Sequence, residues 1–169
     1  TPAPTDDEAG KLINFVRGQD CYDEDYDGNV TCAADEREWK LGDIYHSEMA
    51  IVGPPDTIDT DLAADTNTEE YFKSQNGYQA FIDANASRET MVYVGANDGM
   101  LHAFKDSTGE ELWAFIPPNV LPKLRSMASR VEHVTNPIYG VDGSPVVKDV
   151  LLGGQWRTVL MAGLGREGY

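Results

Sequence analysis

Three short apolar runs in the middle of the chain constrain its fold more than any other feature. Residues 91–95, 100–104 and 110–116 are rich in β-branched and aromatic side chains, which favour extended strands. Residues 97–99 (Asn-Asp-Gly) and 106–109 (Asp-Ser-Thr-Gly) lie between the runs, and these residue types suit tight turns. The spacing of about ten residues therefore predicts a meander of antiparallel strands.

Two further apolar runs predict the start of a second sheet. Residues 140–152 and 156–162 have strand composition, and Gly153-Gly154 between them predicts a hairpin turn. Propeller blades have four strands each, and a closed ring needs at least four blades. The expected fold class is therefore mainly β, a partial β-propeller of about one and a half blades. The rest of a propeller or partner chains would complete the sheet edges, because a bare edge invites aggregation.

The N-terminal third predicts one helix and one extended segment. The apolar spacing of residues 12–16 predicts a short amphipathic helix that Gly18 ends. Thr5 and Glu8 have the spacing of a capping box at its start. Residues 39–52 predict an extended segment that enters a strand, because glycine and two prolines follow directly.

Other segments predict a loop and two short helical stretches. Residues 56–68 are dominated by aspartate and threonine and predict a loop. Residues 69–84 predict a helical insertion that is interrupted near Gly77. Residues 119–130 predict a connecting helix, because leucines and a methionine recur at intervals of three residues.

The charge of the chain is strongly negative and unevenly placed. The net charge is −16, and residues 1–70 carry 19 acidic and 4 basic residues, whereas residues 71–169 carry 10 and 9. This acidity argues against nucleic acid as a partner. No apolar run has the length of a membrane span, and the start lacks the pattern of a signal peptide and looks like a processed end. We expect an N-terminal part, residues 1–38, and a partial propeller, residues 39–169, that contains the helical insertion.

Two cysteines bracket an acidic stretch. Cys21 and Cys32 are the only cysteines, and five acidic residues lie between or beside them. The spacing suits a disulfide rather than a redox motif, which favours an extracytoplasmic protein. Loop-closure estimates give such a bond roughly 2–3 kcal/mol of stabilisation. Two unpaired thiols in a reducing compartment are the alternative.

The acidic stretch has the pattern of a calcium loop. Calcium binds six to eight hard oxygens, and an EF-hand loop supplies them from defined positions around a glycine at position 6. Gly28 falls at that position, but position 12 holds Ala34 in place of the bidentate glutamate. Asp20 or Asp35 could substitute for it. The alternative is a solvated charge run. The candidate Ca²⁺ ligands are Asp23, Asp25, Asp27, Asn29, Thr31 and Asp35.

Other motifs carry little chemistry. Gly163, Gly165 and Gly168 match a dinucleotide fingerprint, but the preceding strands do not form the βαβ unit that such binding requires. The three histidines are too far apart in sequence for a local metal motif, and we expect His46 and His102 to be hydrogen-bonded strand residues. No catalytic site is recognisable, so we expect no enzyme activity.

Several of these segments carry a family resemblance. Residues 91–104 and 108–118 resemble a signature of PilY-type proteins, the type IV pilus assembly and tip-adhesin family. Residues 39–47 are similar to the family segment that leads into the propeller, and residues 141–147 and 156–160 to its next blade.

The resemblance implies a quinoprotein-like propeller in a secreted or cell-surface protein. It implies roles in pilus biogenesis, retraction control and adhesion, minor pilins or other pilus subunits as partners, and calcium bound in an aspartate-rich loop. The chain departs from the family at Glu48-Met49, where a small residue and proline are usual, and lacks the large N-terminal adhesin region. We assign the calcium role to residues 23–35 because of their chemistry, and not because they align with the calcium loop of the family.

Two alternative functions stay open at this point. The blade motif is shared with dehydrogenases that depend on pyrroloquinoline quinone, and the chain could be a fragment of such a propeller. A structural subunit of an extracellular filament, with its sheet edges paired by strands of other subunits, is the second alternative.

Overall fold

One complete four-stranded blade forms the centre of the computed structural model, which describes residues 6–32, 36–128 and 136–165. Its strands are β1 (Ala50–Val52), β2 (Met91–Gly95), β3 (Leu101–Lys105) and β4 (Glu111–Phe115). They lie in the order β1-β2-β3-β4, and each pair is antiparallel. The predicted meander is therefore confirmed as three of the four strands.

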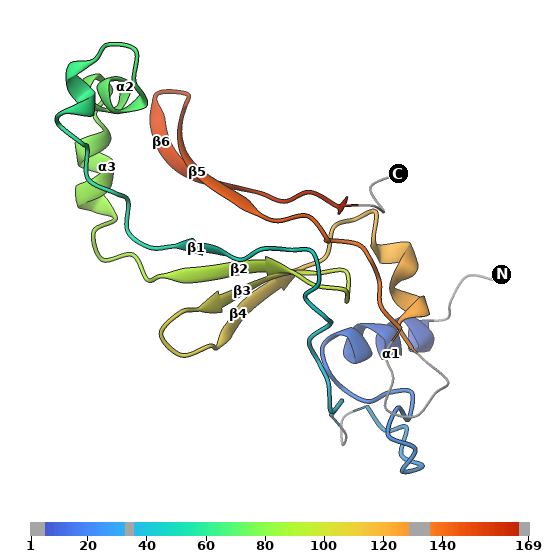
Figure 1. Cartoon of the computed structure of the whole chain (residues 1–169). Coiled ribbons are helices and arrows are strands. Elements are labelled where there is room, and N and C mark those ends of the chain that lie inside the picture. The colour runs from blue at the N-terminus through green and yellow to red at the C-terminus, as the bar shows by residue number, and fades with distance from the viewer. Residues whose placement is uncertain (1–5, 33–35, 129–135, 166–169) are drawn as a thin grey trace.

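A second sheet begins after the blade. The strands β5 (Val146–Leu152) and β6 (Gln155–Met161) form an antiparallel hairpin in which Val146 is opposite Met161. Gly153 and Gly154 turn the chain with φ of 58° and 78°, which a glycine adopts without steric cost. Four strands plus two give the expected one and a half blades. Figure 1 shows this hairpin beside the four-stranded sheet.

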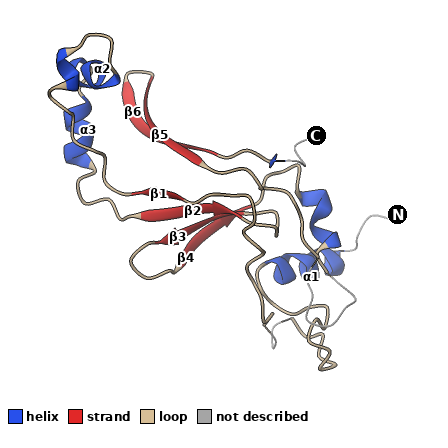
Figure 2. Ribbon diagram, in the orientation of Figure 1, coloured by secondary structure: helices blue, strands red, loops and turns tan. Residues whose placement is uncertain are grey.

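A helical insertion separates β1 from β2. Its helices are α2 (Glu69–Gln75) and α3 (Tyr78–Ala84), and between them Gly77 has a φ of 71°, which confirms the predicted break. Thr68 caps α2, since its side chain accepts a hydrogen bond from the Tyr71 N–H. Figure 2 shows both helices beside the tip of the β5–β6 hairpin.

The insertion is fastened to the second blade by side chains. The ring of Trp156 on β6 lies 5.9 Å from that of Phe72 and 4.7 Å from that of Tyr78. The Tyr78 hydroxyl donates to Asp149 Oδ2 at 2.6 Å, and the Trp156 indole donates to the Asn76 carbonyl at 2.8 Å. We call residues 69–84 the strap, because they connect the first blade to the second.

A small core joins the N-terminal helix to the segment after β4. The helix α1 (Asp6–Val16) ends before Gly18 as predicted, and Phe15 on it is fully buried. Phe15 packs in one cluster with Leu124 on η2 (Leu121–Ser126), a 3₁₀ helix, and with Met127, which follows that helix. The N-terminal part and the propeller part therefore share a core.

Two expected segments contain 3₁₀ helices. The segment expected to be a loop contains η1, a 3₁₀ turn at Leu62–Ala64, whose first backbone N–H groups bond to Asp59. The connecting helix is the 3₁₀ helix η2 rather than an α-helix, since apolar residues three apart also match three residues per turn. The capping residue Thr5 and residues 129–130 of that helix lie outside the described residues.

Candidate metal centre

The base of the acidic loop is closed by covalent and polar contacts. Cys21 and Cys32 form the predicted disulfide, with their Cα atoms 4.4 Å apart. Just outside them, Gln19 and Glu36 form an antiparallel bridge. The two chain ends of the loop are thus held together, so a bound ion would meet a restricted set of loop conformations.

A buried ion pair fixes the loop to α1. Arg37 donates through Nε to Glu24 Oε2 at 2.9 Å, and both residues are buried. The Arg37 guanidinium also lies 4.2 Å from the centre of the Phe15 ring. Breaking such a pair is costly, because it leaves a charge in a site that water does not reach.

Asp20 orders the first turn of the loop. Its carboxylate is buried and accepts backbone N–H bonds, at 3.2 Å from Tyr22, 2.7 Å from Glu24 and 3.4 Å from Asp25. These bonds satisfy the carboxylate within the protein. Asp20 therefore organises the loop, and it lies outside the group of three aspartates whose carboxylates come together.

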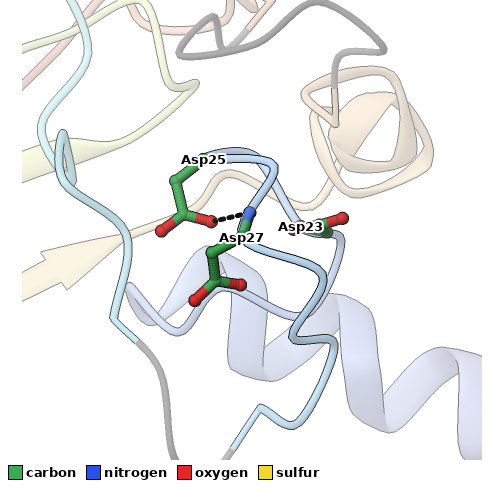
Figure 3. A group of neighbouring side chains, drawn as sticks. All are labelled: Asp23, Asp25 and Asp27. Carbon is green, nitrogen blue, oxygen red and sulfur yellow. Dashed lines mark hydrogen bonds between the residues drawn. The ribbon is translucent and has the colours of Figure 1, made fainter.

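Three aspartates come together as the sequence predicts. One carboxylate oxygen from each of Asp23, Asp25 and Asp27 lies within 4.8 Å of the others. The Gly28 N–H donates to Asp23 at 2.9 Å and the Asp27 N–H to Asp25 at 3.2 Å (Figure 3). These turns curl the backbone around the side chains, and Gly28 has a φ of 86°. Closely spaced carboxylates on a curled loop fit the hard, oxygen-rich coordination of Ca²⁺.

The remaining predicted ligands continue the same curl. The Asn29 N–H donates to Asp27 at 2.6 Å, and the Asn29 side chain accepts from the Thr31 N–H at 2.9 Å. Asn29 and Thr31 therefore lie next to the aspartates along the loop. Asp35 lies outside the described residues, as does Ala34.

The histidines differ in their settings. His102 on β3 is buried, and its ring bonds to Asp98 at 3.0 Å and to Glu111 at 2.5 Å, so it is the hydrogen-bonded strand residue expected. Burial opposes protonation of His102, but the two carboxylates outweigh it and raise the pKa of the imidazole. His46 lies outside the strands, which corrects the expectation for it, and bonds to Asp142.

The fingerprint glycines lie after an antiparallel hairpin. β6 pairs with β5, so the preceding strands form no βαβ unit. Gly168 lies outside the described residues.

In the part of the chain that the structure describes, no helix is long and apolar enough to cross a membrane.

Trp113 lies where two blades meet. It is partly exposed on β4 and lines an apolar hollow together with Leu160 and Leu164 from the second blade. This placement allows Trp113 to contribute to the packing between the two blades.

A complete antiparallel blade followed by the first hairpin of the next one defines this chain as part of a β-propeller. The family model of the PilY1 beta-propeller domain matches residues 41–169. The chain belongs to this PilY1 propeller family, which confirms the resemblance seen in the sequence.

Curated relatives of this chain carry the name PilY1. The type IV pilus biogenesis factor PilY1 of Pseudomonas aeruginosa strain UCBPP-PA14 is 36% identical over 163 residues, which are 96% of this chain and 13% of that protein. A PilY1 homolog of Xylella fastidiosa strain Temecula1 is 39% identical over 167 residues, covering 95% of this chain and 12% of that protein. The chain thus spans about an eighth of the length of these curated relatives.

A solved structure is also similar. The crystal structure of the Pseudomonas aeruginosa PilY1 C-terminal domain has 39% sequence identity and a TM-score of 0.48, covering 70% of this chain and 20% of that one.

Proposed function

We propose that this chain is a calcium-binding, non-enzymatic part of a type IV pilus biogenesis factor at the cell surface. Its acidic loop binds Ca²⁺, and its blades belong to a propeller that acts in pilus assembly, in pilus tip function and in adhesion. Minor pilins or other pilus subunits are its partners. The family match over residues 41–169 and the printed names of the relatives support the pilus role.

The cluster of three aspartates is the observation that carries the calcium part of the proposal. Six or more oxygens are needed for Ca²⁺, and the loop supplies carboxylates at alternate positions together with Asn29 and Thr31. Without the bidentate ligand at position 12, we expect a dissociation constant of about 10⁻⁴–10⁻³ M, the range of extracellular modules. The Cys21–Cys32 disulfide supports an extracytoplasmic location.

Calorimetric titration tests the metal site. Calcium is added to the chelator-stripped chain, to Asp25→Asn and to Asp61→Asn. The amide of Asp25→Asn can still accept the Asp27 N–H bond, so this variant removes a charge while it keeps the turn. Asp61 is an exposed acidic residue outside the acidic loop of residues 20–32, and it serves as the matched control. We expect roughly tenfold weaker binding for Asp25→Asn and wild-type binding for Asp61→Asn.

Two results would contradict the metal site. One is no heat at millimolar calcium, and the other is equal binding by the two variants. The pilus role is tested separately, by shearing surface pili from cells that carry or lack the full-length gene. Pili that are equally abundant in both strains would sink the pilus role and leave the metal result standing.

A further inference from the structure

A polar cleft lies where the chain leads into β1 and into β5. Residues 43–46 form one wall, Tyr139 and Asp142 form the other, and Asn97 from the turn between β2 and β3 lines the cleft between them. Its volume is about 730 Å³, which accommodates a long side chain. None of the acidic-loop residues 20–32 lines it. The cleft is therefore separate from the candidate metal centre.

Backbone and side-chain contacts fix the two walls relative to each other. The Asn97 N–H donates to the Asp43 carbonyl at 2.9 Å, and the Glu48 N–H donates to Ser144 Oγ at 3.0 Å. His46 Nδ1 lies 2.8 Å and 3.0 Å from the two carboxylate oxygens of Asp142. The cleft is thus held open by its own structure and needs no ligand to form.

Apart from the titratable His46, the charged side chains that line the cleft are acidic. Asp43 is exposed, and Asp142 is 6% exposed and places a second carboxylate in the wall. No lysine or arginine is among the described residues that line the cleft. A negatively charged cleft attracts a cation and repels an anion.

Two tyrosine rings stand at the mouth of the cleft. Tyr45 is 76% exposed and Tyr139 is 45% exposed, a large aromatic area to leave in water. The Tyr45 ring meets that of His46 edge to face at 4.5 Å between centroids. Aromatic faces attract cations, and the planar guanidinium stacks on them better than a compact, strongly hydrated ammonium does.

Asn97 offers a polar side chain to a group that enters the cleft. The residue is only 7% exposed, and among the described residues no group hydrogen-bonds to its side-chain amide. These amide atoms are not shut off from solvent, because the Tyr22 hydroxyl is the one enclosed side-chain group without a partner among the described residues. The side-chain oxygen of Asn97 can accept a hydrogen bond from a donor that enters the cleft.

We propose that this cleft binds the guanidinium group of an arginine presented by a partner polypeptide. The N–H groups of the guanidinium would donate to the Asp43 carboxylate and to the side-chain oxygen of Asn97. The planar guanidinium would stack on one of the two tyrosine rings. The exposed apolar side chain of Ile44, 44% exposed at the rim, offers contact to residues that flank the arginine. The proposal does not rest on calcium binding.

Titration of short blocked peptides into the full chain tests the proposal. The probes are acetyl-Gly-Arg-Gly-amide, its citrulline analogue, which has the same shape without the charge, and its lysine analogue. We expect binding of the arginine peptide. The citrulline peptide should bind roughly tenfold more weakly or worse, because its hydrogen bonds are not charge-assisted. The lysine peptide should also bind roughly tenfold more weakly or worse, because its ammonium lacks the planar fork of donors and stacks poorly on an aromatic ring. Free argininamide is expected to bind more weakly than the tripeptide.

Variants locate the site. Asp43→Asn is expected to weaken the arginine peptide roughly tenfold, whereas Asp106→Asn, an equally exposed acid on the β3–β4 turn, binds like wild type. Asp25→Asn in the acidic loop also binds like wild type, which separates this site from the metal site. Tyr139→Leu provides a second variant, with circular dichroism as the check of folding.

Several results would overturn the proposal. If the citrulline peptide binds as tightly as the arginine peptide, charge has no role in binding. If the lysine peptide binds more tightly than the arginine peptide, the cleft does not prefer a guanidinium. Argininamide as tight as the tripeptide replaces the polypeptide partner with a free small molecule. If both Asp43→Asn and Tyr139→Leu bind the arginine peptide with wild-type affinity, the peptide binds outside this cleft.

Discussion

Replacing Tyr78 with phenylalanine tests whether the strap stabilises the junction of the two blades. The ring of Tyr78 is buried, and its hydroxyl donates to Asp149 on β5 at 2.6 Å. Tyr78→Phe keeps the ring against Trp156 and removes only the hydroxyl. The effect therefore reports one hydrogen bond between the strap and the second blade.

The magnitude follows from the charge of the acceptor. A hydrogen bond to a charged group contributes about 1.5–3 kcal/mol. Asp149 is partly exposed and keeps its bond from Thr158 at 2.6 Å, so water can replace part of the loss. We therefore expect the lower end, about 1.5 kcal/mol, which corresponds to a fall in Tm of about 3–6 °C for a chain of this size.

Alkaline pH gives the same bond a second signature. Burial and the Asp149 carboxylate raise the pKa of Tyr78 above its ordinary value of 10.0. Its contribution is thus fully present below pH 10 and is lost as the pH rises towards the folded pKa. The difference in unfolding free energy between wild type and Tyr78→Phe should therefore shrink above pH 10.

Urea unfolding followed by circular dichroism measures these differences. Tyr71→Phe on α2 is the control, since no described residue hydrogen-bonds to the Tyr71 hydroxyl. We expect its unfolding free energy to stay within about 0.5 kcal/mol of wild type. The reasoning fails if both variants unfold at the same urea concentration, or if the gap for Tyr78→Phe is unchanged at high pH.

Two further predictions concern buried groups. Because His102 has a raised pKa, its contribution to stability is full below pH 6.5 and is lost as the pH rises through the folded pKa. His102→Gln should therefore flatten the pH dependence of urea unfolding above pH 6.5, and an unchanged profile would contradict this. Reduction of the Cys21–Cys32 bond should lower the unfolding free energy by roughly 2–3 kcal/mol, checked by denaturation with and without reductant; equal curves, with mass spectrometry confirming reduction, would refute it.

The parts of the fold that local signals specify could be predicted from the sequence. The strands β2 to β4 alternate with turns in which Gly99 and Gly109 adopt the positive φ that other residues rarely adopt, and the break at Gly77 has the same origin. The aspartates of the acidic loop are also local, since Asp23 and Asp27 are four residues apart. Their spacing and the turn hydrogen bonds of the loop itself bring them together.

The parts that depend on distant contacts could not be predicted. His46 and Asp142 are 96 residues apart, and only the pairing of neighbouring blades brings them together. Asn97 was read as a turn residue, which it is, but its burial comes from the segments that pack over the turn. Ser47 before β1 and Ser144 before β5 accept backbone N–H bonds from Gly95 and from Glu48, and these partners are 48 and 96 residues away in the sequence.

The strap has a geometric consequence for any longer propeller that contains this chain. Blades in a ring are related by rotation about one axis, so the angle between two neighbours sets how many blades close a full circle. Contacts such as Trp156 to Asn76 and Lys148 to Glu69 resist a change in that angle between the first blade and the second. The strap therefore acts on the curvature of the ring, and later blades inherit the angle that it holds.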